Sequence, residues 1–282
     1  NVDVSGTLNI AGAMTVSGVM TVDSGASVVG GKNATIVNNG KIFNNGIITL
    51  AKDSAYTGTG TFVAGADSTA TFPKNTTTSN ITGTGTVTGY TPGDKANEAD
   101  LSSEKNVDSA LVNNYLKAGM DVTLPTNGLT IAEKDKIVVS GSMISGHVKY
   151  GTTDEIVLNA LKGDFSITAG KSIDIIDITG IEGTIDVWKG AVELTGKVTG
   201  KLIVNTGTQS ADKIAKFSDF TVNSGAELVL TGKGTFTVVA DKSFNLYGSL
   251  ADGRTDTEKK DSTISVIVPE KASFKAYSGS QI

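Results

Sequence analysis

A six-residue repeat near the start of the chain constrains the fold more than any other feature of the sequence. Residues 6–11, 12–17 and 18–23 each begin with glycine and carry aliphatic or methionine side chains at their third and fifth positions. The pattern returns at 40–51, with Asn44 in one of the apolar places. Side chains two positions apart face the same side of a short strand, and glycine allows turn conformations at no steric cost. The chain is therefore predicted to turn every six residues.

Strands this short cannot bury an apolar face alone, but strands that turn and stack share one continuous core. We therefore predict a β-solenoid. Its predicted core contains Leu8, Ile10, Met14, Val16, Met20, Val22, Ile42 and Ile48. A meander of hairpins is the alternative, because the pairs Asn39-Gly40 and Asn45-Gly46 also suit hairpin turns.

Alternating apolar residues return in the second half of the chain, chiefly over 165–246, and predict further coils. Between the halves, residues 90–104 are polar and charged, which is typical of a turn and a linker. The predicted fold is all-β, with parallel β-solenoid (β-helix) coils in two units. We expect a short-coil unit over 1–92, a linker over 93–105, and a capping helix with a second β-rich unit over 106–282.

Residues 106–119 have the helical spacing of apolar side chains, with Asn106 expected to cap the start and Gly119 to end it in the left-handed conformation. A strand ending in Leu124-Pro125 and the sequence GLTI at 128–131 follow. This order resembles the segment that opens many right-handed parallel β-helices, including the pectate-lyase-like superfamily. The resemblance implies that the helix covers the open end of the second unit's first coil.

The composition excludes several classes of partner. The net charge is -5 without a basic run, which leaves no electrostatic footprint for nucleic acid or an anionic membrane. Cysteine is absent, so disulfides and thiolate metal sites are excluded. No apolar stretch approaches the roughly 18 residues of a transmembrane segment. The chain starts at Asn1 without a basic-then-apolar leader, as expected of a mature chain after signal removal or of a recombinant one.

No residue pattern predicts a catalytic centre. His147 is the only histidine, and its sequence neighbours supply neither a triad nor a metal site. Arg254 is the only arginine, whereas the lyases of the β-helix superfamily often use arginine as proton acceptor. Asp174, Asp186 and Glu193 project from neighbouring predicted strands, but a glycosidase needs two carboxylates that face one cleft. We therefore expect no enzyme and no cofactor.

Two kinds of exposed site remain as candidates. Sequons predict N-glycosylation in a suitable host at Asn33, Asn75 and Asn80. A polar excursion predicted over 252–261 carries clustered carboxylates, which are candidate Ca²⁺ ligands at a contact between subunits or else simply a hydrated loop. These carboxylates are Asp252, Asp256 and Glu258.

The Gly-Thr-Leu-Asn-Ile unit at 6–10, the Asn-Asn-Gly turns at 38–40 and 44–46, and the Thr-rich polar faces resemble surface-layer, sheath and adhesin-like proteins of archaea and bacteria. The six-residue repeats are also similar to those of bactofilins, whose β-helices polymerise end to end. The resemblance implies a secreted structural protein of the cell surface whose main partner is a copy of itself.

The start of the repeat favours the same function on physical grounds. Gly6 follows a segment too short for a helical cap, so the first coil is predicted to expose unpaired backbone groups. Strand addition from a neighbouring copy would satisfy them in a head-to-tail contact that does not close, and so build filaments or sheets. Proline at Val4 is expected to block this pairing. The predicted contact residues are Asn1, Val2, Asp3, Val4, Phe274, Tyr277 and Ile282.

Two other functions remain open: an adhesin stalk that binds host or matrix glycans, and a carbohydrate-active β-helix enzyme. Both would use an aromatic-lined groove. Trp188 is the only tryptophan, and the 6 tyrosines are spread along the chain, so the sequence does not predict such a groove.

Overall fold

The computed structural model describes residues 1–73, 76, 80–89, 97–207, 212–261 and 264–282. It is nearly all-β, with 56% of residues in strands and 5% in helices, and it confirms the predicted parallel β-solenoid. The chain divides into two compact units. One contains Asn1–Ala99 and Asn114–Asp121, and the other contains Asp100–Asn113 and Val122–Ile282.

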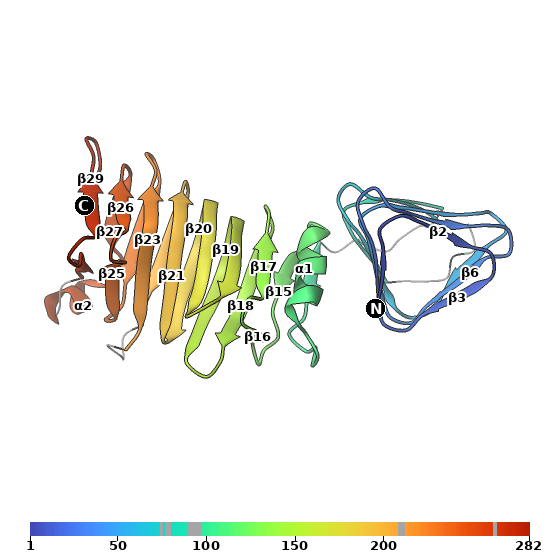
Figure 1. Ribbon diagram of the computed structural model, residues 1–282, viewed down its shortest axis with the longest axis horizontal. Helices are drawn as coiled ribbons and strands as arrows, with labels where there is room; N and C mark the ends of the chain where they lie inside the picture. The colour runs from blue at the N-terminus through green and yellow to red at the C-terminus, as the bar shows by residue number, and fades with distance from the viewer. Residues whose placement is uncertain (74–75, 77–79, 90–96, 208–211, 262–263) are drawn as a thin grey trace. The chain divides into compact units, whose positions relative to one another are not determined.

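Short strands on the sides of a triangular outline form each coil of the first unit (Figure 1). The first three coils contain β1 (Val2–Val4), β2 (Thr7–Ile10) and β3 (Ala13–Val16), then β4 (Val19–Val22), β5 (Ser27–Gly30) and β6 (Thr35–Asn38), then β7 (Lys41–Asn44), β8 (Ile47–Leu50) and β9 (Ala55–Thr57). The next two contain β10 (Thr61–Ala64) and β11 (Thr69–Thr71), then β12 (Ile81–Gly83) and β13 (Thr86–Thr88). The ladders between these strands are parallel, so the alternative of a hairpin meander is wrong.

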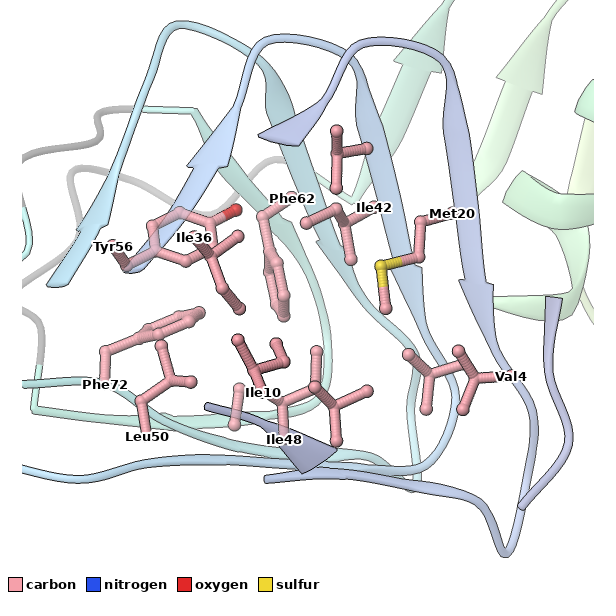
Figure 2. Close-up of a cluster of buried hydrophobic side chains, with 14 of the residues drawn as sticks. Val4, Ile10, Met20, Ile36, Ile42, Ile48, Leu50, Tyr56, Phe62 and Phe72 are labelled. Atoms are coloured by element: carbon pink, nitrogen blue, oxygen red, sulfur yellow. The ribbon is translucent and has the colours of Figure 1, made fainter. Parts of the chain in front are cut away.

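The apolar side chains of the first unit converge on one interior, as Figure 2 shows. Six of the eight predicted core residues are buried, and the ladders stack them from coil to coil, as with Met20 and Ile42. Leu8 and Met14 are only partly buried, which corrects the prediction. Both lie on the first coil, which has a neighbouring coil on one side only among the described residues, whereas their ladder partners Val28 and Ile36 on the second coil are buried.

Asn44, the polar residue in an apolar place of the repeat, is fully buried. Its Nδ2 donates to the carbonyl oxygen of Thr69 at 3.1 Å, and its Oδ1 accepts from the N–H of Gly46 at 3.3 Å. Burial of an amide is tolerated when its donors and acceptors find partners. Asn44 therefore links the corner after its own strand to the next coil.

Corners between the first and second strands of successive coils alternate between two and four residues. They lie at 5–6, 23–26, 45–46, 65–68 and 84–85. A four-residue corner is a turn closed by a backbone bond, such as Ala26 N–H to Asp23 C=O at 2.9 Å, with Gly25 at φ 81°. A two-residue corner ends in glycine. It crosses the four-residue corner of the preceding coil, which means that its backbone lies directly against that turn, as the bond from Ile47 N–H to Ala26 C=O at 3.0 Å shows. Corners of unequal length therefore stack in register.

A single large sheet winds through the second unit, whose strands stack side by side in Figure 1. Its strands are β14 (Glu98–Asp100), β15 (Asp121–Thr123), β16 (Leu129–Ile131), β17 (Lys136–Val139), β18 (Met143–Tyr150), β19 (Asp154–Ala169), β20 (Ile173–Lys189), β21 (Ala191–Val198), β22 (Lys201–Asn205), β23 (Ile214–Val222), β24 (Glu227–Thr231), β25 (Thr235–Val238), β26 (Ser243–Leu246), β27 (Ser249–Asp252), β28 (Val266–Ile267) and β29 (Ser273–Ala276). Strand β14 lies in the segment predicted as a linker, of which 93–96 fall outside the described residues.

Some ladders of the second unit are antiparallel, which corrects the prediction of uniformly parallel coils. Strand β19 runs antiparallel to β17, β18 and β20. Segments 165–167 and 173–175, predicted as successive coils, form a hairpin in which Ile167 pairs with Ile175. The alternation of apolar residues has the same period in both kinds of ladder, so it does not reveal this reversal. From β20 onward the ladders are parallel.

Helix α1 (Ser109–Lys117) confirms the predicted helix, with a later start. Asp108, not Asn106, caps it, because its Oδ1 accepts from the N–H of Leu111 at 2.8 Å. Asn106 lies too far before the first turn to reach these N–H groups. Gly119 has φ 76° and ends the helix as predicted.

The helix packs on the first coil of the second unit through Asn113, as expected. Its Nδ2 donates to the carbonyl oxygen of Lys136 at 2.7 Å, and its Oδ1 accepts from the N–H of Val138 at 2.9 Å. One side chain thus pairs with the edge of β17. A second helix, α2 (Asp256–Asp261), lies in the polar excursion predicted over 252–261.

Candidate assembly surfaces at the solenoid ends

Among the described residues, the first coil of the first unit has a neighbouring coil on one side only. Among the described residues, β1 pairs only with β4, β2 only with β5 and β3 only with β6. Val2 is 55% exposed, although one coil later Met20 is 1% exposed in the paired position. Such an edge offers unpaired N–H and C=O groups, together with apolar side chains, to another strand.

The predicted contact residues of β1 differ in the direction of their backbone groups. The carbonyl oxygen of Val4 accepts from the N–H of Asp23 at 2.9 Å, so Val4 faces β4. Alternate residues of a parallel strand face opposite edges, which turns the backbone of Asp3 and Ser5 toward the open edge. Proline at Val4 would therefore disrupt the coil itself, and Asp3 is the position that tests strand pairing.

Asn1 is exposed, but its side chain also holds the chain's own fold. Its Oδ1 accepts from the N–H of Val19 at 3.4 Å. The same oxygen lies 3.5 Å from the place that a Cβ on Gly18 would occupy. Asn1 therefore lies against the corner that leads into the second coil.

The last described coil of the second unit likewise has a neighbouring coil on one side only. Within the described part of the chain, β28 pairs only with β25 and β29 only with β26. A recess of about 380 Å³ opens there, with Leu250, Val266 and Ile282 in its apolar lining. Phe274 also lines the recess, and its ring stacks on that of Phe244 with centroids 4.9 Å apart. Ile282 is 83% exposed, so this edge also presents apolar surface.

Tyr277 continues a column of aromatic side chains at the same end. Its ring stacks on that of Tyr247, with centroids 4.1 Å apart and an angle of 11° between the planes. Both rings are exposed. Sequence reasoning identified Tyr277 but missed Tyr247, because the excursion that contains α2 separates the two positions in the chain.

Of the three sequon asparagines, Asn33 and Asn80 are exposed and Asn75 lies outside the described residues. Asn33 occupies a corner with φ 64°. The Nδ2 of Asn80 donates to the carbonyl oxygen of Thr59 at 2.9 Å. Asn33 is therefore the more open acceptor for a glycan.

Two of the three carboxylates considered for Ca²⁺, Asp252 and Glu258, bind groups of their own segment. Asp252 accepts from Arg254 through both oxygens, at 3.0 Å from Nε to Oδ1 and 2.7 Å from the guanidinium to Oδ2. Glu258 accepts from the N–H of Thr255 at 2.8 Å and so holds the start of α2. In the part of the chain that the structure describes, no three potential metal ligands come together.

The guanidinium of Arg254, mainly through its hydrogen bonds, lowers the pKa of Asp252 from 3.8 to about 2. We predict that Arg254→Gln raises this pKa toward 3.8, as measured by NMR titration of the carboxyl carbon. Because the pKa is depressed in the folded state, the pair stabilises the fold above about pH 4 and loses this contribution as the pH falls through about 2. An unshifted Asp252 in the wild type would contradict the contact.

The three carboxylates considered for glycoside chemistry do not all lie together. Asp174 and Glu193 are partners in the ladder between β20 and β21, and burial raises the pKa of Asp174. Asp186 lies near the other end of β20, where its Oδ1 accepts from Nδ2 of Asn205 at 2.7 Å. Asp174 and Glu193 therefore lie side by side, whereas Asp186 lies apart from them and bonds to Asn205.

Trp188 on β20 is 58% exposed and lies in a cluster with His147 and Lys213. The His147 ring meets it edge to face with centroids 5.7 Å apart, and Nζ of Lys213 lies 5.7 Å from its centroid. Nδ1 of His147 lies 2.6 Å from Oε1 of Glu155, which fixes the imidazole. A recess of about 500 Å³, lined in part by Lys189, adjoins the indole. Sequence reasoning treated Trp188 as isolated because its neighbours lie far away in the chain.

The chain matches no protein-family model, no curated protein and no solved structure. Within the described residues, neither α1 nor α2 is long and apolar enough to cross a membrane. The surfaces described above therefore carry the functional proposal.

Proposed function

We propose that the protein is a structural subunit of an extracellular assembly, such as a surface layer, sheath or filament, whose copies associate by pairing strands at their solenoid ends. The open coil edges carry this proposal: β1–β3 and β28–β29 each have a strand on one side only among the described residues. The resemblance to surface proteins and the exposed sequon at Asn33 support a place outside the cell.

The two edges offer a contact that both backbone and side chains favour. Each coil of a solenoid is covered by its neighbours, so an end coil gains cover when another coil is added. Val2 at one edge and Ile282 at the other would lose exposed apolar area, which is favourable by about 25 cal/mol for each Å² removed from water. Because the edges differ, the contact is head-to-tail, and it builds an open filament when the rotation between copies does not close a ring.

Sedimentation velocity over a concentration series tests this function. Wild-type protein should form species larger than the 28.9 kDa subunit, and these should grow with concentration. Asp3→Pro removes an N–H from the open edge and is expected to leave single subunits with an unchanged circular dichroism spectrum. Parallel runs with Ca²⁺ added or chelated show whether the ion contributes to the contact.

Lys32→Pro is the matched control, because Lys32 is the second residue of a turn closed by Ala34 N–H to Gly31 C=O at 3.1 Å, where proline fits. This variant should assemble like the wild type. A wild-type chain that stays at the mass of one subunit at every concentration would contradict the proposed function, as would unchanged assembly of Asp3→Pro.

The Trp188 cluster favours a second candidate function, adhesion to glycans. An exposed indole beside a recess is a surface on which a sugar ring can stack. This function predicts that Trp188→Ala weakens glycan binding at least about tenfold, while Tyr247→Ala, another exposed aromatic, leaves it unchanged. Glycan-array screening followed by calorimetry measures both. Equal loss in the two variants, or no glycan binding by the wild type, would exclude it.

A further inference from the structure

Two corners, one in each unit, share both sequence and geometry. Residues 21–29 read TVDSGASVV, and residues 221–229 read TVNSGAELV. Each contains a four-residue corner closed by the N–H of its alanine, at 2.9 Å in the first unit and 3.0 Å in the second. Gly25 and Gly225 both have φ 81°. The two units therefore build this corner in the same way.

The alternation of corner lengths is also shared. In the second unit the corners at 199–200, 223–226, 247–248 and 277–280 contain two, four, two and four residues. Ser249 N–H donates to Ala226 C=O at 2.9 Å, as Ile47 N–H does to Ala26 C=O at 3.0 Å in the first unit. In both units, each four-residue corner is thus crossed by a two-residue corner of the next coil that ends in glycine. Within the described residues, the exception is the last four-residue corner, at 277–280.

The glycine of a crossing corner has a steric reason. A Cβ on Gly46 would lie 2.5 Å from the carbonyl oxygen of Asp23 and closer still to that of Ala26. A Cβ on Gly248 would meet the equivalent atoms of its own preceding corner. Gly6 ends the corner of the first coil, yet a Cβ there would have nothing within 4 Å. Corner 5–6 therefore has the form that crosses a preceding four-residue corner. Corner 23–26 stacks on one side of it, as the bond from Ser27 N–H to Gly6 C=O at 2.9 Å shows, but among the described residues no four-residue corner lies on its other side.

The last corner of the second unit has the complementary form. Residues 277–280 form a turn closed by Ser280 N–H to Tyr277 C=O at 3.0 Å, with Gly279 at φ 89°. We propose that corner 5–6 of one copy crosses corner 277–280 of another copy, so that the alternation of corners continues from chain to chain. This inference rests on the proposed function and adds to it the register in which two copies meet.

The register follows from the corners that already stack within each unit. Where two corners stack, the residue three positions before one corner pairs with the residue three positions before the other. Met20, before corner 23–26, pairs in this way with Ile42, before corner 45–46. By the same count, β1 of one copy pairs with β29 of the other, which places Val2 on Phe274 and Asp3 beside Lys275. The exposed Val2 then covers a ring that lines the open recess.

Two further features fit this register. Asp3 and Lys275 are both exposed, and opposite charges on adjacent strands attract. The strands that follow two stacked corners also pair. The residue two positions after one corner is the partner of the residue two positions after the other, as Val28 is of Ile48. That rule places the partly buried Leu8 on Ile282, which is 83% exposed. Apolar positions therefore meet on both sides of the corner, and charges meet on the outer face.

Charge reversal tests the register. Asp3→Lys and Lys275→Asp should each raise the concentration needed for half-assembly about tenfold, because each sets like charges side by side. A chain that carries both changes should assemble within about threefold of the wild type, since the attractive pair is restored. Sedimentation velocity measures assembly, and circular dichroism verifies that the coils are intact. Single variants without effect, or a double variant that is not rescued, would overturn the register.

A pair of glycine variants supplies an independent test. Gly6 and Gly12 both end two-residue corners of the first coil, and a Cβ on either would have nothing within 4 Å. In the proposed register only Gly6 crosses a corner of another copy. Gly6→Val should therefore abolish assembly at concentrations where the wild type is assembled, whereas Gly12→Val should not change it.

The outcomes separate the two proposals. Assembly that survives Gly6→Val, or that Gly12→Val blocks instead, would overturn the register while leaving end-to-end association in place. Wild-type protein that stays monomeric would overturn both.

Discussion

Replacing Gly46 with valine is expected to lower the free energy of unfolding by about 3 kcal/mol. The added Cβ would collide with the carbonyl oxygens of Asp23 and Ala26, which belong to the corner of the preceding coil. Both obstacles are backbone atoms of a closed turn, so neither can rotate away. Urea unfolding followed by circular dichroism measures the loss, and hydrogen exchange over 41–64 shows whether it lies in the first unit.

Gly6→Val is the matched control for this prediction. It makes the same change at the same kind of corner, but its Cβ would meet nothing within 4 Å. Measured at concentrations where the protein is monomeric, it should change the free energy of unfolding by less than about 0.5 kcal/mol. Equal losses for Gly46→Val and Gly6→Val would mean that corner stacking does not explain these glycines.

Phe220→Ala is expected to cost about 3–5 kcal/mol, because it removes a fully buried ring from the core of the second unit. The Phe220 ring packs against Phe217 and Phe244, with centroids 5.1 Å and 5.6 Å away. A cavity there would be closed in by neighbouring coils, which limits relaxation. Urea unfolding with hydrogen exchange over 214–246 measures the effect.

Phe274→Ala provides the comparison at the open end of the same ladder. Phe244 pairs with Phe220 on one side and with Phe274 on the other, but Phe274 is only partly buried. In the monomer this variant should cost clearly less than Phe220→Ala. A loss as large as that of Phe220→Ala would contradict an open last coil.

The repeat predicted the coils of the first unit because its two requirements are local. Alternating apolar residues define the buried side of each strand, and a glycine defines each corner. The exposure of Leu8 and Met14 was not predictable in this way, since it depends on how many coils lie beside them. The reversal at β19 was missed for a related reason: the turn between β19 and β20 is as short as the corners between parallel strands.

The candidate assembly surfaces were predictable only in part. Val2, Phe274 and Tyr277 were singled out because they are apolar or aromatic residues in or beside the first and last strands. Lys275 was not singled out, although it follows Phe274 directly, because its proposed partner is defined by the register of two chains. The cluster of Trp188 with Lys213 was missed because a ladder of strands, not the sequence, makes them neighbours.

Negative-stain electron microscopy of the purified wild-type protein tests end-to-end association most directly. We expect filaments or sheets in which subunits join end to end and which lengthen as the concentration rises, and we expect Asp3→Lys to shorten or remove them. Fields of single subunits at every concentration, with circular dichroism that verifies folded β-coils, would contradict the claim that the solenoid ends join copies of this chain.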